Sequence, residues 1–416
     1  MEIISEIKRR GVWLSLLLLS WCCFSCSDDG YLNVIPADST ALISIDVADA
    51  ASASKGVNAN VLKSLFRVSD VADCGIDLSA KVFLFESVDG TLGIVARVKS
   101  ERKLDDWLNK LAAKGLCKPT QERRDLHFTV MRQSWLVGYS DDALLVMGPA
   151  VSMAQSELMR QMMRYLKADE GIVGTPLFER LETLSSPVAM VSQAQALPQQ
   201  LIAPFTLGAP ADADASQVFI AAEMHADKGC VVMEGETFSF DEKINAALQQ
   251  SQNIYRPLTE EYLRLIPAQS LFTMAMNADG RQLLPLMRQS REFRALLTGV
   301  GVKIDIDKFV EQVDGDLVLT IPAYDEENMQ MEWAAKLRDD RTPLDADSEQ
   351  QLEKTSLTTP AQALPENVIA QMAGSHMSVL LHLSSVSGEK QEIVNAFSAL
   401  LKPLFGEVEY VVYRRR

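Results

Sequence analysis

Apolar residues from Tyr31 onward recur with two different periods, which predict a chain that mixes strands with helices. Ala41 to Val47 alternates apolar and polar positions, the period of a half-buried strand. Three pairs of apolar runs are each separated by a short turn containing aspartate, and such turns predict antiparallel hairpins. These pairs are 81–87 with 91–98, 134–140 with 143–148, and 218–225 with 230–238.

Helical periodicity marks three further segments, in which apolar residues fall three or four positions apart. These stripes are Leu104, Trp107, Leu108 and Leu111; Met159, Met162, Met163 and Leu166; and Ile393, Val394, Phe397, Leu400, Leu401 and Leu404. Ser100 is placed to cap the first helix and Gly115 to end it, while Thr175 before Pro176 predicts the start of a shorter helix. Strands and helices do not alternate regularly, so we expect an α+β fold of antiparallel strand-rich sheets with packed helices.

Several short motifs occur twice in the same order. Ile35-Pro36-Ala37-Asp38-Ser39 matches residues 266–270, residues 75–78 match 303–306, and residues 86–92 match 311–317. These matches predict two related lobes from an internal duplication, at 35–150 and 263–416, with a middle helical and hairpin segment at 151–262. The duplication requires Asp89-Gly90 and Asp314-Gly315 to occupy equivalent turns. The alternative is the chance recurrence of turn motifs.

The N-terminus has the organisation of an export signal. The basic residues Lys8 to Arg10 precede an uncharged run of 15 residues from Gly11 to Ser25, which is too short to span a bilayer as a helix. A small residue followed by Cys26 resembles a bacterial lipoprotein signal, although Cys23 stands where an aliphatic residue is usual. We therefore expect a signal peptide at 1–25, lipidation of Cys26 and an acylated tether at 26–34. The alternative is an uncleaved anchor helix.

The cysteine count changes once residues 1–25 are removed. Of the six cysteines in the chain, Cys22 and Cys23 leave with the signal peptide, and Cys26 carries the lipid. Cys74, Cys117 and Cys230 are too few and too widely spaced for a disulfide framework, and we expect small buried apolar side chains there, with one disulfide as the alternative.

Charge and motif content exclude several classes of function. Lys and Arg number 40 against 56 Asp and Glu, a net charge of −16, which repels nucleic-acid phosphates. A hydrophobic content of 47% with 23% charged residues is that of a globular protein, which excludes a disordered chain. The four histidines, His127, His225, His376 and His382, form no catalytic or metal-binding motif. We expect no catalytic residue, no cofactor and no metal site, and hence no enzyme.

The N-terminal signal and several short motifs together resemble a known group of proteins. Ser27-Asp28-Asp29 is similar to the acidic signal that directs Bacteroidetes lipoproteins to the cell surface. The lipoprotein start, the Ile-Pro-Ala-Asp-Ser motif before the first strand, residues 75–78 and the second Ile-Pro-Ala copy resemble a Bacteroidetes lipoprotein family with a large domain of unknown function. That resemblance implies no catalytic residues.

From these observations we expect a non-enzymatic binding or assembly module, attached to the outer membrane through Cys26. Cell-surface exposure is expected, with the periplasmic face as the alternative, and an envelope protein or a glycan as partner. The alternatives are a glycan- or nutrient-capturing accessory of an outer-membrane transporter and, less favoured, a hydrolase with dispersed active-site residues. An exposed aromatic cluster would favour the accessory, and a cleft gathering histidine with acidic residues would favour the hydrolase.

Overall fold

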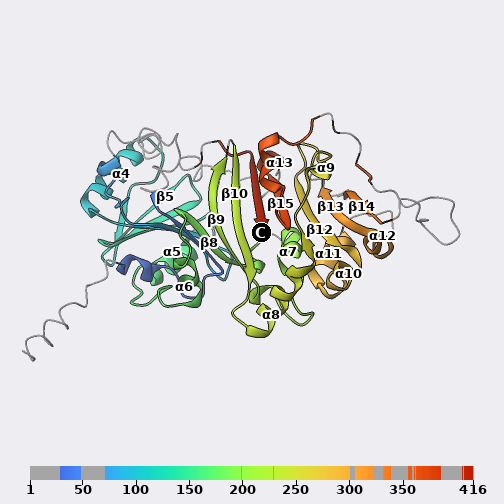
Figure 1. The fold of residues 1–416 in the computed structure, drawn as a ribbon. Helices are drawn as coiled ribbons and strands as arrows, with labels where there is room; N and C mark the ends of the chain where they lie inside the picture. Colours follow the sequence, from blue (N-terminus) through green and yellow to red (C-terminus); the bar gives the residue numbers. More distant parts are fainter. Residues whose placement is uncertain are drawn as a thin grey trace, which may run out of the picture.

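Alternating apolar segments pair edge to edge into one long sheet that runs through the molecule and carries helices on both faces (Figure 1). This computed structural model describes residues 29–47, 71–197, 199–227, 229–299, 305–321, 331–338, 355–357, 360, 362–385, 405 and 407–415. The sheet is mixed with helices as an α+β fold, as the sequence predicts.

The described strands are β1 (Ala41–Ile45), β2 (Val82–Glu86), β3 (Leu92–Arg97), β4 (Gln121–Arg123), β5 (Leu126–Met131), β6 (Trp135–Tyr139), β7 (Ala143–Gly148), β8 (Val188–Gln193), β9 (Phe219–Asp227), β10 (Cys230–Phe238), β11 (Tyr255–Arg256), β12 (Phe272–Asp279), β13 (Val313–Ile321), β14 (Glu332–Leu337), β15 (Met377–His382) and β16 (Tyr410–Arg415). Their order across the sheet is β14-β13-β12-β15-β16-β10-β9-β8-β1-β2-β3-β7-β6-β5-β4, and β11 pairs with β12.

The described helices are α4 (Glu101–Ala113), α5 (Gln155–Tyr165), α6 (Pro176–Glu182), α7 (Gln199–Thr206), α8 (Glu242–Ser251), α9 (Glu260–Leu263), α10 (Gly280–Gln289), α11 (Arg291–Gly299), α12 (Ile306–Gln312) and α13 (Glu366–Met372). Short 3-10 turns add η1 (Gly30–Val34), η2 (Val71–Cys74), η3 (Ala194–Ala196), η4 (Ala215–Gln217), η5 (Gln252–Ile254) and η6 (Leu383–Ser385). No helix within these described residues is long and apolar enough to cross a membrane.

The local sequence signals lead to the elements they predict. The three hairpins form as β2–β3, β6–β7 and β9–β10, all antiparallel. Ser100 caps α4 by accepting a hydrogen bond from the backbone N–H of Lys103, and Thr175 accepts one from Phe178 ahead of α6. The third predicted helix, at 393–404, lies outside the described residues.

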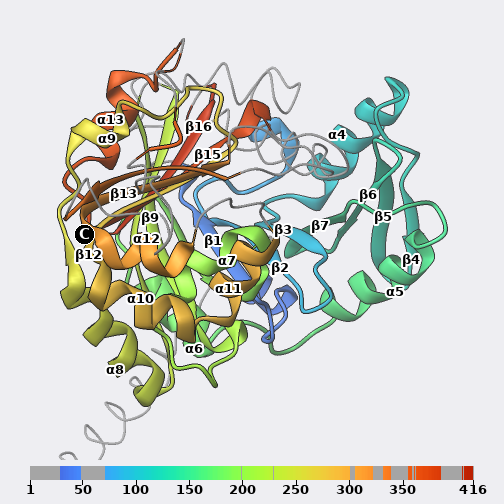
Figure 2. The same cartoon turned by 90° about the vertical axis from the view of Figure 1, so that its right-hand side faces the viewer.

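Each face of the sheet carries two apolar cores. In the half that contains β1 to β7, helices α5 and α6 with η1 cover one face and α4 covers the other. In the half that contains β12 to β16, helices α7, α10, α11 and α12 lie together over one face, as Figure 2 shows, and α9 and α13 lie over the other. The core under α10 also includes Ile45, Val188 and Met190 from the first half. The two halves therefore share one of their cores.

The two halves have the same strand order around their first strands. The series β3-β2-β1-β8-β9 corresponds in position to β14-β13-β12-β15-β16, and the Ile-Pro-Ala motifs precede the equivalent strands β1 and β12. The parallel pair of β10 with β16 joins the series, whereas the other strand pairs of the described sheet are antiparallel.

The predicted equivalence of the two Asp-Gly turns is wrong. Asp89-Gly90 lies after β2, in its turn to β3, whereas Asp314-Gly315 lies at the beginning of β13, the strand equivalent to β2. Asp-Gly is favoured at many strand ends because glycine reaches backbone conformations that other residues avoid, so it recurs without common ancestry. These sequence matches do not establish a duplication.

Candidate functional site

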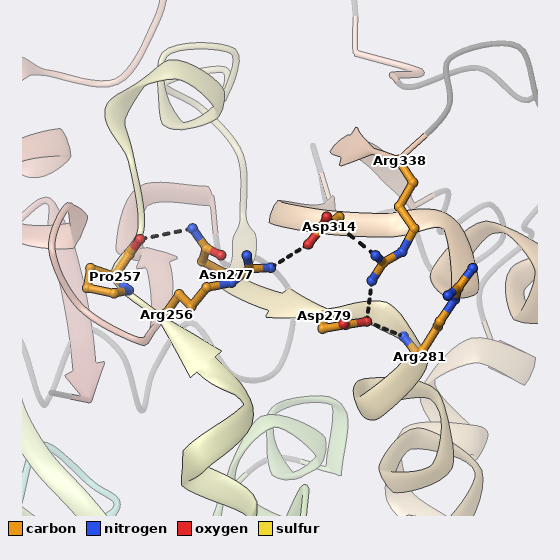
Figure 3. A network of polar contacts seen from close by, with 7 residues as sticks. All are labelled: Arg256, Pro257, Asn277, Asp279, Arg281, Asp314 and Arg338. Carbon is orange, nitrogen blue, oxygen red and sulfur yellow. Dashed lines mark hydrogen bonds and ion pairs between the residues drawn. The ribbon is translucent and has the colours of Figure 1, made fainter.

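Charged side chains gather where β11, β12 and β14 end and β13 begins, in the second half of the sheet (Figure 3). Arg338 pairs with Asp279, and its second guanidinium nitrogen lies 3.4 Å from Asp314. Arg256 lies 2.8 Å from the other oxygen of Asp314. Asp279 also caps α10, accepting a hydrogen bond of 2.9 Å from the backbone N–H of Arg281. Both carboxylates therefore join strand ends through arginine side chains, and Asp279 also joins its strand to α10, which are structural roles.

A buried carboxylate lies two residues along β13 from Asp314 of this network. Asp316 on β13 is 2% exposed and accepts hydrogen bonds from the backbone N–H and the hydroxyl of Thr259. Burial raises the pKa of Asp316, and the contacts with Thr259 offset only part of that effect. Asn277, directly opposite on β12, donates to the carbonyl of Pro257 at 2.9 Å. The cluster fixes the segment between β11 and α9 against the sheet.

A second buried acidic group lies in the first half, and its pKa is shifted in the opposite direction. Asp77 accepts hydrogen bonds from Ser79 at 2.6 Å and from two guanidinium nitrogens of Arg97 at 2.5 and 3.0 Å. Burial alone would raise the pKa of Asp77, but the hydrogen bonds from Ser79 and Arg97 outweigh it and lower the pKa to about 2. This carboxylate is held ionised, which makes it a structural anchor and unsuited to acid catalysis.

His127 lies beside acidic residues of α4. Its Nε2 is 3.0 Å from Glu101, and its ring stacks on Tyr139 of the neighbouring strand with centroids 4.9 Å apart. The Tyr139 hydroxyl donates to Asp105 at 2.9 Å. Burial, and then this contact with Asp105, raise the pKa of the Tyr139 hydroxyl. These contacts fasten α4 to β5 and β6.

His382 on β15 has a serine hydroxyl hydrogen-bonded to its ring. Its Nδ1 is 2.6 Å from the Ser385 hydroxyl, and its Nε2 is 3.5 Å from Glu409. A serine nucleophile has to give its proton to histidine. Here the Ser385 hydroxyl donates to the carbonyl of Gln269 at 3.0 Å, so the histidine donates to the serine. The direction of proton donation is the reverse of that in a catalytic triad.

Four exposed apolar side chains lie beyond strand ends at the same end of the sheet. Val88 is 65% exposed, Val151 74%, Met153 95% and Phe240 45%. Val88 follows β2, Val151 and Met153 follow β7, and Phe240 follows β10. The pairings Leu92 with Gly148, Glu86 with Ala41 and Gln193 with Phe219 bring these strand ends to the same end of the sheet. We call these four residues the apolar rim.

The chain enters the fold at the opposite end of the sheet. Gly30 begins η1 beside Asp142, the residue before β7, whereas the rim residues Val151 and Met153 follow the last residue of that strand. η1 is firmly packed, since Tyr31, Leu32 and Val34 are each 4% exposed. The length of β7 thus separates the point of chain entry from the apolar rim.

The structure describes only some of the residues singled out in the sequence. Cys26, Ser27 and Asp28 lie outside the described residues, and Asp29 is exposed directly before η1. Cys74 and Cys230 are buried and Cys117 is half-buried, and all three are free, so the alternative of a disulfide among them is wrong. Burial raises the pKa of each of these three thiols, as expected of inert side chains.

The methionine stripe of α5 and two tryptophans, Trp107 and Trp333, belong to the apolar cores. Met162 is fully buried, and Met159 and Met163 pack against the same core, so the methionine stripe of α5 faces inward. Trp107 lies on the buried face of α4, and Trp333 packs edge-on against Phe309 with ring centroids 5.9 Å apart. No group of three or more histidine, cysteine, aspartate or glutamate side chains in the described part of the chain could hold a metal ion.

The apolar rim was missed in the sequence because its members are far apart in the chain and each follows a different strand. The signal was a single apolar residue within a polar turn, as with Val88 beside Asp89-Gly90. One such residue is common on protein surfaces and carries no information until the fold places several together.

Comparison with known proteins gives a family without an assigned activity. A family model described as a domain of unknown function (DUF4836) matches residues 50–337, more than two thirds of the chain. No curated protein sequence matches the chain. Among solved structures, crystal form IV of TP0453 is similar at a TM-score of 0.30 and 12% identity, covering 48% of this chain and 76% of that one. Crystal form III gives 0.29 and 10%, covering 55% and 88%.

Proposed function

This chain belongs to the family of the domain of unknown function DUF4836, and we propose that it is a non-enzymatic binding module held at the cell envelope by a lipid on Cys26. The observation that carries the proposal is the position of the apolar rim. An attachment at Cys26 leads into the fold at Gly30, and the rim is at the other end of the sheet. A module built in this way presents its apolar contact surface away from the membrane.

The tether in this arrangement is short. Tyr31, the first side chain buried in the core, is five positions after Cys26, and a fully extended chain over that interval spans about 17 Å. The six residues of β7 add about 20 Å between the entry point and the rim. The folded body would therefore lie close to the membrane, with the rim on its distal side. Ser27, Asp28 and Asp29 would direct the protein to the outer face of the outer membrane.

The partner that fits the rim best is an envelope protein with a complementary apolar surface. Exposed apolar side chains grouped on one part of a folded protein mark interaction surfaces. A glycan-binding platform requires several exposed aromatic rings, and Phe240 is the only aromatic among the large apolar side chains exposed in the described residues. Phe240 packs edge-on against Phe219 and Phe238, with ring centroids 4.7 and 5.2 Å apart, so part of its ring is already covered. A protein contact is favoured over sugar stacking for this reason.

The anchor is tested by Cys26→Ala. We expect this variant to lose labelling by a fatty-acid analogue and to accumulate as an unprocessed precursor, because no thiol remains at the cleavage site to be acylated. Cys74→Ala is the matched control and should be labelled like the native chain. A Cys26→Ala protein that is still processed and still membrane-bound would contradict the lipid anchor.

The rim is tested separately, by a photo-crosslinking amino acid placed at Met153 in intact cells. We expect a discrete crosslinked product there, and none with the same probe at Asp141, an exposed turn residue at the other end of β7. Val151→Asp should remove the product without lowering the melting temperature, because Val151 is 74% exposed. Equal products at both positions, or a product that persists in Val151→Asp, would rule the rim out as the contact surface.

A further inference from the structure

Among the described residues, no carboxylate pairs with the buried cation Arg415. It is the last residue of β16 and is 3% exposed, and its Nη2 nitrogen has no hydrogen-bond acceptor. The neighbouring Arg414 points to the other face of the sheet and pairs with Glu234 at 2.6 Å. None of the ion pairs between described residues includes Arg415, whose nearest aromatic neighbour is Tyr255, with the guanidinium carbon 4.7 Å from the ring centroid.

Three buried hydroxyl groups near Arg415 likewise have no partner with hydrogen-bond geometry among the described residues. They belong to Tyr255 on β11, Tyr413 on β16 and Thr237 on β10, which are 6%, 4% and 1% exposed. Tyr413 lies on the same face of β16 as Arg415, two residues earlier. The positive charge of Arg415 lowers the pKa of both tyrosines against the larger effect of burial, so the guanidinium lies within electrostatic reach of both rings. Two side-chain contacts also lower these pKa values, one between the Tyr255 hydroxyl and Arg415 and one between the Tyr413 and Thr237 hydroxyls, so the four side chains form one cluster.

Such a grouping is unfavourable unless something occupies it. A guanidinium cannot lose its proton in a protein, so burial cannot neutralise it as it does a lysine or a carboxyl group. Hydroxyl and guanidinium groups together offer several N–H and O–H donors and one full positive charge. The complementary occupant is an acceptor that carries negative charge. The ring of Tyr255 supplies partial compensation through its π face, but it accepts no hydrogen bond from Nη2.

We propose that Arg415, Thr237, Tyr255 and Tyr413 form an internal binding site for one small inorganic anion of the size of chloride. The guanidinium supplies the charge, and the three hydroxyl groups donate hydrogen bonds from β10, β11 and β16. Because all four side chains are at least nine-tenths buried, the site excludes larger organic anions. The bound ion stabilises the junction of the two halves, since β10 and β16 are the parallel pair that joins them.

The test is thermal unfolding of the purified full-length protein in chloride and in gluconate at constant ionic strength. We expect chloride to raise the melting temperature by a few degrees with a saturable dependence on concentration, because a ligand that binds only the folded state stabilises it. Arg415→Met should remove the dependence on chloride. Arg414→Met is the matched control: it deletes a guanidinium from the same strand and should retain the full dependence.

Two measurements keep the site testable if Arg415→Met does not fold. Tyr255→Phe and Tyr413→Phe each delete one donor and keep the ring, and each should shift the chloride concentration at half-effect upward about tenfold, the value of one hydrogen bond to a charged group. Crystals grown in bromide should show one anomalous peak within hydrogen-bonding distance of Arg415 Nη2. Only water at that position, or an equal chloride response in Arg415→Met and Arg414→Met, would overturn the proposal.

Discussion

Two buried aspartates respond to their surroundings in opposite ways, although both lie on or beside strands. Asp77 meets a guanidinium and a hydroxyl, whereas Asp316 meets Thr259 and Asn277 and forms no ion pair with another described residue. Hydrogen bonding to a cation more than offsets the cost of burying the first carboxylate, and the threonine contacts do not offset it for the second. The stability of the protein should therefore depend on pH differently through each of them.

Asp77→Asn should destabilise the protein at pH 7 by about 2 kcal/mol. The pKa of Asp77 lies below its ordinary value, so its ionised form stabilises the fold above about pH 4, and this stability is lost as the pH falls towards 2. Urea denaturation at pH 7 and at pH 2 should show a large difference between native and variant at pH 7 and a small one at pH 2. As a control, Glu157→Gln, which removes an exposed pair with Arg160, should match the native protein at pH 7.

Asp316→Asn should change the free energy of unfolding at pH 7 in the opposite direction, by raising it. The raised pKa of Asp316 means that the fold favours the protonated form, so the native protein loses stability as the pH rises from about 4 through that raised pKa. Asparagine is uncharged throughout and still accepts a hydrogen bond from Thr259. The variant should be more stable than the native protein at pH 7 and no more stable at pH 3, as measured by urea denaturation. Destabilisation at pH 7 would show that the ionised carboxylate is needed at this position.

At the scale of helices and strands, the close approach of α10 to α12 depends on a missing side chain. A Cβ atom on Gly280 would lie 1.7 Å from the carbonyl oxygen of Val310. Gly280→Ala should therefore push the two helices apart and lower the free energy of unfolding by about 2 kcal/mol or more. Gly374→Ala is the comparison, because that glycine has a φ of +76° but no atom within 4 Å of a Cβ. Gly374→Ala should lower the free energy of unfolding by about 1 kcal/mol. Urea denaturation of the two variants measures both values.

Elements with local signals were predictable from the sequence, and those that depend on distant partners were not. The hairpin at Asp89-Gly90 and the helix after Ser100 are determined by residues within a few positions of each other, and both form as predicted. The strand β16 has apolar residues next to Arg414 and Arg415, and its place at the centre of the sheet depends on β10 and β15, which are remote in sequence. The buried site at Arg415 could not be predicted for the same reason, since three separate strands bring its side chains together.

At the scale of the molecule, the shared core predicts that both halves unfold together. Ile45 and Val188 of the first half pack in the same core as Met274 and Phe309 of the second. The fluorescence of a buried tryptophan reports on the unfolding of each half separately, through Trp107 on α4 and Trp333 on β14. We expect two variants of the mature protein, one with Trp107 and one with Trp333 as its single tryptophan, to give coincident fluorescence transitions in urea.

The control for that experiment is circular dichroism on the same two variants, which corrects for any stability change caused by the tryptophan replacements. Transitions that differ after this correction would mean that the halves unfold independently despite the shared core. The sequence could not decide this question, because the repeated Ile-Pro-Ala motifs equally suit two separate lobes and two halves of one sheet.

The position of β16 also determines when the protein can finish folding during its synthesis. One edge of β10 pairs with β9 directly after the turn between them, but its other edge pairs with β16, which leaves the ribosome more than 170 residues later. At ordinary rates of elongation this interval is roughly 10 to 30 seconds. An open strand edge of nine residues is a site for pairing with other chains. The free edge of β10 therefore stays available for pairing with other chains until β16 arrives.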